Sequence, residues 1–187
     1  LATKMPSWLI KTYDDLDKHF EIQLERLKTD HIDFYLLHTL NEHHWSNYKK
    51  LDVAKWIEKR KAEGSIRKIG FSFHDRYPVF EMILNDYTAW DFCQIQLNYM
   101  DVLYQAGLRG LREASSRGMG VVIMEPLRGG KLAANPQPPA VQAVLDSSKK
   151  GWKPVEWAMQ WLWDQAEVSL VLSGMSTMEQ VQENLAI

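Results

Sequence analysis

Cysteine is almost absent from this chain of 187 residues, in which Cys93 is the only one. A single thiol cannot form an internal disulfide, and it cannot hold an iron–sulfur cluster, which takes about four thiolates. Any redox chemistry carried out by these residues must therefore use a dissociable cofactor.

The chain also lacks an excess of positive charge and long apolar runs. Its 22 basic and 24 acidic side chains leave a formal net charge of −2, which supplies no basic field for a nucleic acid. No stretch approaches the roughly 18 consecutive apolar residues of a membrane span, and residues 1–10 do not resemble a signal peptide. We therefore expect no nucleic-acid or membrane partner, a cytoplasmic location and a small-molecule ligand.

Short apolar runs alternate with amphipathic segments along the whole chain. Continuous apolar runs are typical of buried strands, and apolar residues spaced three and four apart are typical of helices. The expected strands are residues 1–4, 32–37, 66–73, 92–97, 120–124 and 168–172, and the expected helices are 13–28, 48–63, 78–84, 108–117 and one that starts near Pro154.

This alternation predicts a parallel sheet covered by helices, either doubly wound or closed as a barrel. The spacing favours the α/β fold of a (β/α)8 TIM barrel, which uses roughly 31 residues per unit, so that this chain holds about six βα units. The Pro-rich residues 135–139 are too few to separate two domains. We expect one barrel domain over residues 1–187. Six strands are two fewer than a barrel has, and the chain opens at Leu1 without Met. We therefore expect the two other strands before Leu1, and the domain to be partial at its C-terminal end as well.

Polar residues follow the expected strands at their carboxyl ends, where barrels of this kind build their sites. Lys4 and His38 end neighbouring strands. A lysine there can lower the pKa of an adjacent phenol, and a histidine can orient a carbonyl oxygen. Trp8 and Trp45 could line a substrate pocket or pack on the surface. Solvated loops would also place polar residues at these positions, so the pattern leaves both readings open.

Two segments have features of anion sites. Gly129 and Gly130 permit close backbone approach, and Lys131 adds a countercharge, although Leu132 excludes a Walker phosphate loop. Residues 176–179 form a capping-box pattern, whose free N–H groups can bind an anion or can simply cap a helix. Adjacent histidines at 43 and 44 are read as loop, and no metal site is expected.

Several motifs together resemble the aldo-keto reductase family. They are IDFYLLH at 32–38, RKIGFSFH at 67–74, QIQLNYMD at 94–101, GMGVVIMEPLRGGKLA at 118–133 and LSGMSTMEQVQENL at 172–185, and the match is closest to a bacterial predicted-oxidoreductase branch. The family uses an Asp, Tyr, Lys and His tetrad. The resemblance assigns the lysine to Lys4 and the histidine to His38. The tetrad's Asp and Tyr have no counterpart here, since Tyr13, Tyr35 and Tyr48 fall outside the matching motif.

The resemblance also implies a site for NADP or NAD. Ser72 and Gln94 would contact the carboxamide, with His74 nearby. The loop with Glu125, Pro126, Leu127, Gly129 and Lys131 would contact the pyrophosphate. Gly174, Met175, Ser176 and Gln180 would contact the adenosine phosphate, and Glu183 and Asn184 would contact the adenine. Relatives often hold the 2′-phosphate with an arginine near the place of Gln180, so the choice between NADP and NAD stays open.

Three functions remain as hypotheses. The first is NAD(P)H-dependent reduction of an aldehyde or ketone carbonyl to an alcohol. The second is a non-catalytic nucleotide-binding or structural subunit, and the third is an unrelated barrel enzyme that acts on a phosphosugar. The open strand edges of a partial barrel must be covered, either by self-association with another copy of the chain or by the remainder of a longer polypeptide.

Overall fold

Six parallel strands lie side by side in the order in which they occur along the chain. The computed structural model describes residues 1–187, and its strands are β1 (Ala2–Met5), β2 (Ile32–Leu40), β3 (Ile66–Phe73), β4 (Phe92–Gln96), β5 (Gly120–Met124) and β6 (Leu170–Val171). A doubly wound sheet reverses its strand order at the centre, whereas a barrel keeps sequential order. The observed order β1-β2-β3-β4-β5-β6 is therefore that of the (β/α)8 barrel, and the fold-class prediction is confirmed.

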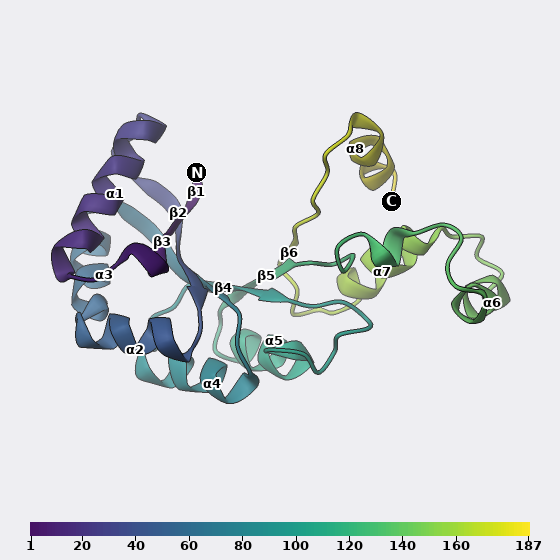
Figure 1. Ribbon diagram of the computed structural model, residues 1–187, viewed down its shortest axis with the longest axis horizontal. Helices are drawn as coiled ribbons and strands as arrows, with labels where there is room; N and C mark the ends of the chain where they lie inside the picture. The colour runs from purple at the N-terminus through teal and green to yellow at the C-terminus, as the bar shows by residue number, and fades with distance from the viewer.

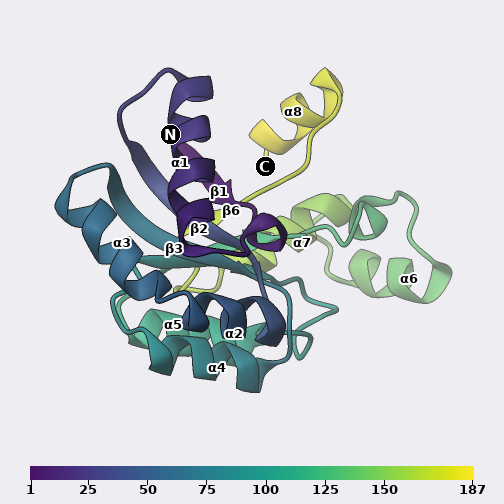
Figure 2. The same ribbon diagram turned by 60° about the vertical axis from the view of Figure 1, so that its left-hand side comes forward.

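Most of the helices cover the outer side of the curved sheet, whereas the helix over Pro139–Ser147 and the last helix, over Met178–Leu185, stand away from it (Figures 1 and 2). The helices are α1 (Tyr13–Leu27), α2 (Glu42–Lys50), α3 (Val53–Ala62), α4 (Tyr77–Asp86), α5 (Gly107–Ser116), α6 (Pro139–Ser147), α7 (Pro154–Trp163) and α8 (Met178–Leu185), with short 3-10 turns η1 (Ser7–Leu9) and η2 (Lys131–Ala133). None of these helices combines the length and the apolar character that crossing a bilayer requires.

The core lies between the sheet and its outer helices. Successive strand residues point to opposite faces, and residues such as Tyr35 and Phe71 point outward, where they are fully buried. Phe20 of α1 meets Tyr35 edge-on, with the ring centroids 5.1 Å apart. Trp45 belongs to this core, since it is 2% exposed and its Nε1 donates to Asp86 Oδ2. The hypothesis that Trp45 lines a substrate pocket is therefore wrong.

The helix expected over residues 48–63 is two helices. Asn41 accepts a hydrogen bond from the His44 N–H and starts α2 earlier than expected. Asp52 then adopts the left-handed conformation, with φ of 53°, and ends the run between α2 and α3. A second unexpected element is α6, which directly follows the Pro-rich segment and has no buried residue. The outermost strands also differ, since β1 is shifted by one residue from the expected 1–4 and β6 keeps only two of five residues.

The inner face of the sheet carries the residues of interest. Lys4 is in register with Leu36, which pairs with Gly70, and Ser72 is in register with Gln94. Gly70 of β3 leaves no room for a side chain beside β4, because a Cβ there would lie 2.6 Å from the Phe92 carbonyl oxygen. This arrangement places Lys4, Ser72 and Gln94 toward the inside of the barrel.

Candidate functional site

A bulge in β2 positions His38. The pairing of β2 with β3 shifts between Leu37 and Leu40, and Thr39 adopts a positive φ of 55°. The Thr39 N–H donates to Ser72 Oγ at 2.7 Å, and its carbonyl oxygen accepts from His44 Nδ1 at 2.8 Å. Because a bulge redirects the strand at its end, these bonds fix where the His38 side chain leaves the sheet.

A second hydrogen-bond chain holds the same bulge from the side of η1. Ser7 Oγ donates to the His38 carbonyl oxygen, and the Tyr48 hydroxyl donates to Ser7 Oγ at 2.9 Å. Ser7 and Tyr48 are 3% and 1% exposed, so water does not compete for these bonds. The imidazole of His38 lies against Trp8, with the ring centroids 5.2 Å apart. Trp8 therefore contacts a candidate catalytic residue, as the sequence allowed.

The structure brings Lys4, His38 and His74 together at the carboxyl ends of β1, β2 and β3. Burial lowers the pKa of His38, and the nearby charges of Lys4 and His74 lower it further. Burial also lowers the pKa of His74, while Glu125 acts in the opposite direction. Both imidazoles are thus held in the neutral form near pH 7, with the Lys4 ammonium beside them.

Ser72 and Gln94 lie next to this group and are buried, with exposures of 1% and 8%. Ser72 Oγ accepts from the Thr39 N–H, which leaves the Ser72 hydroxyl proton available to another acceptor. Gln94 Nε2 donates to Met124 Sδ at 3.2 Å. Both side chains can still offer a hydrogen bond toward the barrel interior.

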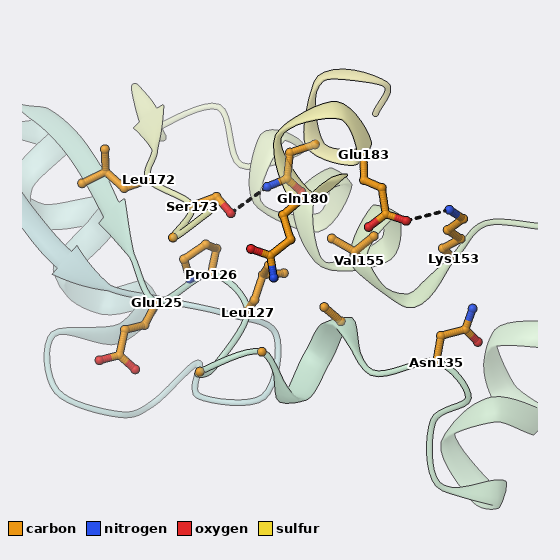
Figure 3. A pocket seen from close by; sticks show the side chains of 15 residues that line it. Glu125, Pro126, Leu127, Asn135, Lys153, Val155, Leu172, Ser173, Gln180 and Glu183 are labelled. Atoms are coloured by element: carbon orange, nitrogen blue, oxygen red, sulfur yellow. Dashed lines mark hydrogen bonds and ion pairs between the residues drawn. The ribbon is translucent and has the colours of Figure 1, made fainter. Parts of the chain in front are cut away.

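A cleft of about 610 Å³ opens where β5 and β6 end, and we call it the β5–β6 cleft (Figure 3). Its walls are the loop after β5, the start of α7, the loop after β6 and α8. Of the residues assigned to a cofactor by resemblance, the following line it: Glu125, Pro126, Leu127, Gly129, Gly174, Gln180, Glu183 and Asn184. These residues come from two segments, the loop after β5 (125–129) and the loop after β6 together with α8 (174–184). The barrel arrangement brings the two segments to the same cleft.

The other expected cofactor residues lie outside this cleft. Ser72 and Gln94 lie on the neighbouring strands, and Met175 and Ser176 are exposed beside the cleft. A second cleft of about 640 Å³, which we call the β3–β5 cleft, is lined by His74 and Lys131. Glu125 and Gly129 line both clefts, so the two adjoin. Lys4 and His38 line neither of them.

The helix start at residues 176–179 differs by one residue from the expected capping box. The N-cap is Thr177, whose side chain accepts from the Gln180 N–H. Gln180 Oε1 in turn accepts from the Ser176 and Thr177 N–H groups at 2.8 and 3.3 Å. Gln can replace Glu in this motif, and the observed pair satisfies the N–H groups of Ser176, Thr177 and Gln180.

Two cations at the clefts were not predicted. Lys153 Nζ lies 3.0 Å from Glu183 Oε1, and both residues line the β5–β6 cleft. Arg128 Nε lies 3.2 Å from Asp101 Oδ2 in the β3–β5 cleft. Lys153 precedes the helix-starting Pro154, which marks it as a loop-to-helix boundary residue. Nothing in the sequence pairs it with a residue 30 positions away.

A parallel sheet in sequential order, with adjoining clefts at the carboxyl ends of its strands, defines an α/β protein of the (β/α)8-barrel class. Six of the eight βα units of such a barrel are present in this chain. A model of the Aldo/keto reductase family matches residues 1–187, and the chain belongs to this family.

Known proteins agree with this assignment. The chain is 30% identical over 196 residues to L-galactose dehydrogenase of Arabidopsis thaliana. The aligned region covers 90% of this chain and 56% of that protein. It is 29% identical to an aldo-keto reductase of Mycolicibacterium vanbaalenii, covering 88% of this chain and 54% of that protein. The chain thus spans about half the length of these curated relatives.

Solved structures share the fold. The holo form of aldo-keto reductase AKR11C1 from Bacillus halodurans superposes with a TM-score of 0.81 at 24% identity, covering 100% of this chain and 65% of that one. The apo form of the same protein gives a TM-score of 0.75 and covers 64% of its chain.

Proposed function

We propose that this chain forms the cofactor-binding part of an NAD(P)H-dependent oxidoreductase that reduces aldehyde or ketone carbonyls to alcohols. The observation that carries the proposal is the β5–β6 cleft, which adjoins the group formed by Lys4, His38 and His74 through Glu125. The names of the relatives, a dehydrogenase and a reductase, support the same reaction class. We further propose that residues 1–187 act as one domain and that the protein works in the cytoplasm, which its scarcity of cysteine favours.

The cleft suits a nicotinamide dinucleotide, either NADP or NAD. Its volume of about 610 Å³ lies in the range of about 300–1,000 Å³ found for cofactor sites. Gly129 and Gly130 have positive φ, and a Cβ at either would meet nothing within 4 Å, so that the backbone is open to a ligand. Asn184, Gln180 and Glu183 offer amide and carboxylate groups of the kind that bind adenine and ribose.

Lys4 and His38 are proposed to act on the carbonyl group of the substrate. When bound, the reduced nicotinamide supplies the hydride that the carbonyl carbon accepts. The neutral imidazole of His38 can donate a hydrogen bond to the carbonyl oxygen and so orient it. The proton that completes the alcohol would come from the tetrad's Tyr, which has no counterpart in residues 1–187, and Lys4 would lower the pKa of that phenol. The bulge at Thr39 and the bond from Ser7 hold His38 for this task.

A non-catalytic nucleotide-binding subunit is the second candidate. The observation that favours it concerns the tyrosines near β1 and β2. The Tyr35 hydroxyl donates to Gln23 Oε1, and the Tyr48 hydroxyl donates to Ser7 Oγ, so both are engaged within the outer layer. Neither hydroxyl is available as a proton donor on the inner face, where the tetrad of the family works.

Nucleotide titration and a turnover assay separate these candidates. Quenching of tryptophan fluorescence measures the binding of NADPH and NADH, and loss of NAD(P)H absorbance with a panel of aldehydes measures reduction. Binding with turnover supports the oxidoreductase, and binding without turnover in the full-length protein supports the subunit. Absence of binding by either nucleotide contradicts both candidates.

A further inference from the structure

Two tyrosines, Tyr35 of β2 and Tyr48 of α2, are buried in the outer layer of the barrel, with exposures of 0% and 1%. Burial raises the pKa of both hydroxyls above the ordinary value of about 10, so both keep their protons. A buried tyrosine hydroxyl needs a hydrogen-bond partner. In each case the partner is a side chain that bonds in turn to the main chain of a candidate catalytic residue.

The first hydrogen-bond chain runs from Tyr35 to Lys4. The Tyr35 hydroxyl donates to Oε1 of Gln23, on α1, at 2.7 Å, and Gln23 Nε2 donates to the Lys4 carbonyl oxygen at 2.8 Å (α1 in Figure 1). The Phe34 N–H donates to the Leu1 carbonyl oxygen, and carbonyl groups alternate between the two edges of a strand, so the Lys4 carbonyl faces away from β2. Because β1 is the outermost strand of this chain, Gln23 bonds that carbonyl instead of a strand.

The second hydrogen-bond chain runs from Tyr48 to His38. The Tyr48 hydroxyl donates to Ser7 Oγ at 2.9 Å, and Ser7 Oγ donates to the His38 carbonyl oxygen. A carbonyl oxygen can only accept, so the one proton of Ser7 points to His38 and Tyr48 must be the donor. His38 lies in the bulge, where the register of β2 with β3 is interrupted between Leu37 and Leu40.

Each hydrogen-bond chain therefore holds a peptide group from which a candidate catalytic side chain leaves, at a place where regular strand pairing does not hold it. If the peptide group of Lys4 or His38 turns, the ammonium or the imidazole moves with it. A misplacement of about 1 Å in an active site can cost about 10²-fold in rate. Bonds made in the outer layer thus set the geometry of a site at the strand ends.

We propose that Tyr35 and Tyr48 are positioning residues, which hold Lys4 and His38 through Gln23 and Ser7. This inference rests on the proposed function, because it assumes that Lys4 and His38 take part in carbonyl reduction. Neither tyrosine touches the substrate or supplies its proton. Their hydroxyls act through the main chain, so that their removal lowers the rate of reduction.

The first measurement is of the side-chain NMR signals of His38 and Lys4 in the full-length protein without ligand. Tyr48→Phe keeps the ring and removes only the hydroxyl. It shifts the His38 signals and raises the pKa of His38 toward the ordinary value of about 6.5, because the imidazole loses part of its burial. The charges of Lys4 and His74, which also lower this pKa, are unchanged in the variant. Tyr35→Phe shifts the Lys4 signals instead.

Tyr87→Phe is the matched control. Tyr87 is also buried, and its hydroxyl donates to Glu58, which takes no part in either hydrogen-bond chain. The control moves neither set of signals. Unchanged signals in Tyr35→Phe and Tyr48→Phe overturn the inference. Equal shifts of both sets in every variant show a general loosening of the fold, and they overturn it as well.

Steady-state kinetics of the full-length protein measures the effect on the reaction. Tyr35→Phe and Tyr48→Phe each lower kcat by about 10- to 100-fold, whereas the dissociation constant of the nucleotide changes by less than about twofold. Tyr87→Phe leaves both values unchanged. A loss of kcat smaller than about twofold in the two variants contradicts the positioning role.

A His38→Gln background shows whether Tyr48 acts through His38. Tyr48→Phe causes no further loss of kcat in this background, because its target is absent, whereas Tyr35→Phe still lowers kcat. A full additional loss from Tyr48→Phe contradicts the assignment. Absence of turnover by the unmodified full-length protein contradicts the proposed function itself, and the NMR shifts test the positioning of the two side chains in either case, which distinguishes the two failures.

Discussion

Lys4 is the residue whose removal separates chemistry from cofactor binding. In the full-length protein, Lys4→Met lowers turnover by about 10²- to 10⁴-fold, the range credited to general acid–base assistance. The affinity for the nucleotide stays nearly unchanged, because Lys4 lines neither cleft. Steady-state kinetics and nucleotide titration measure the two effects. Lys11→Met, at an exposed lysine beyond β1, serves as the control, and a loss of less than about tenfold in Lys4→Met counts against its role.

His38 makes the stability of the fold depend on pH. Burial, and then the charges of Lys4 and His74, lower its pKa in the folded state, so the unfolded chain takes up the proton first. Its contribution is therefore present above the usual imidazole pKa of about 6.5 and is lost as the pH falls below that value. Urea unfolding at pH 7.5 and 5.5 shows a larger loss of stability in the unmodified protein than in His38→Gln. Equal losses in the two proteins contradict this assignment.

At the scale of elements, the contact between β3 and β4 depends on a glycine. Gly70→Ala places a Cβ 2.6 Å from the Phe92 carbonyl oxygen and 2.8 Å from its ring, so the strands must separate. Overpacking of this kind destabilises a fold by about 1–3 kcal/mol. At Gly120, on β5, the nearest atom to an added Cβ is 3.5 Å away, which is an ordinary contact. Chemical denaturation compares Gly70→Ala with Gly120→Ala, and equal stabilities of the two variants would refute the close approach.

The bulge of β2 links three elements to one candidate catalytic residue. Ser7 from η1, Ser72 from β3 and His44 from α2 each bond to the backbone at His38 or Thr39. Because Ser72 is also expected to contact the carboxamide, its hydroxyl connects the cofactor side of the site to the backbone that carries His38. This connection follows from the register of β2 with β3.

At the scale of the whole molecule, β1 and β6 are the outer strands of an open sheet, each with one edge unpaired within this chain. Leu170 of β6 is 51% exposed. Unpaired parallel edges with apolar side chains associate readily. The 187-residue chain is therefore expected to elute as a dimer or larger species, above its monomer mass of 21.8 kDa, when light scattering follows size exclusion. A monodisperse monomer at high concentration contradicts this expectation.

The same chain is expected to bind nucleotide without reducing carbonyls. The residues assigned to the cofactor by resemblance all lie from Ser72 onward, so the chain contains them. The hydroxyls of Tyr35 and Tyr48 are hydrogen-bonded in the outer layer and cannot donate a proton to the substrate. The rate of NADPH or NADH oxidation with a panel of aldehydes stays at background. Binding of either nucleotide is measured separately by the quenching of the chain's tryptophan fluorescence. Turnover by a pure 187-residue chain would show that another residue donates the proton.

Much of the fold was predictable from local pattern. The strand over residues 120–124 is observed as β5 with the same bounds, and the helix expected over 13–28 is observed as α1. A continuous apolar run and a regular amphipathic stripe are properties of neighbouring residues, so they survive in any tertiary setting. The placement of Lys4 and His38 at adjacent strand ends followed from the same local pattern combined with the sequential order of the strands.

What the tertiary structure decided depends on residues far apart in the chain. The bulge at Thr39 is held by Ser72, which accepts from the Thr39 N–H, and by Ser7, which donates to the His38 carbonyl oxygen. The break at Asp52 separates α2 from α3. The pairing of Lys153 with Glu183 required two residues 30 positions apart, one just before α7 and one within α8, to meet at one cleft. Sequence patterning specifies which residues are buried and in what order the strands follow, because burial is a local preference. The charge balance inside the cleft was set only by the folded chain, because it depends on which side chains the barrel brings within a few ångströms of one another.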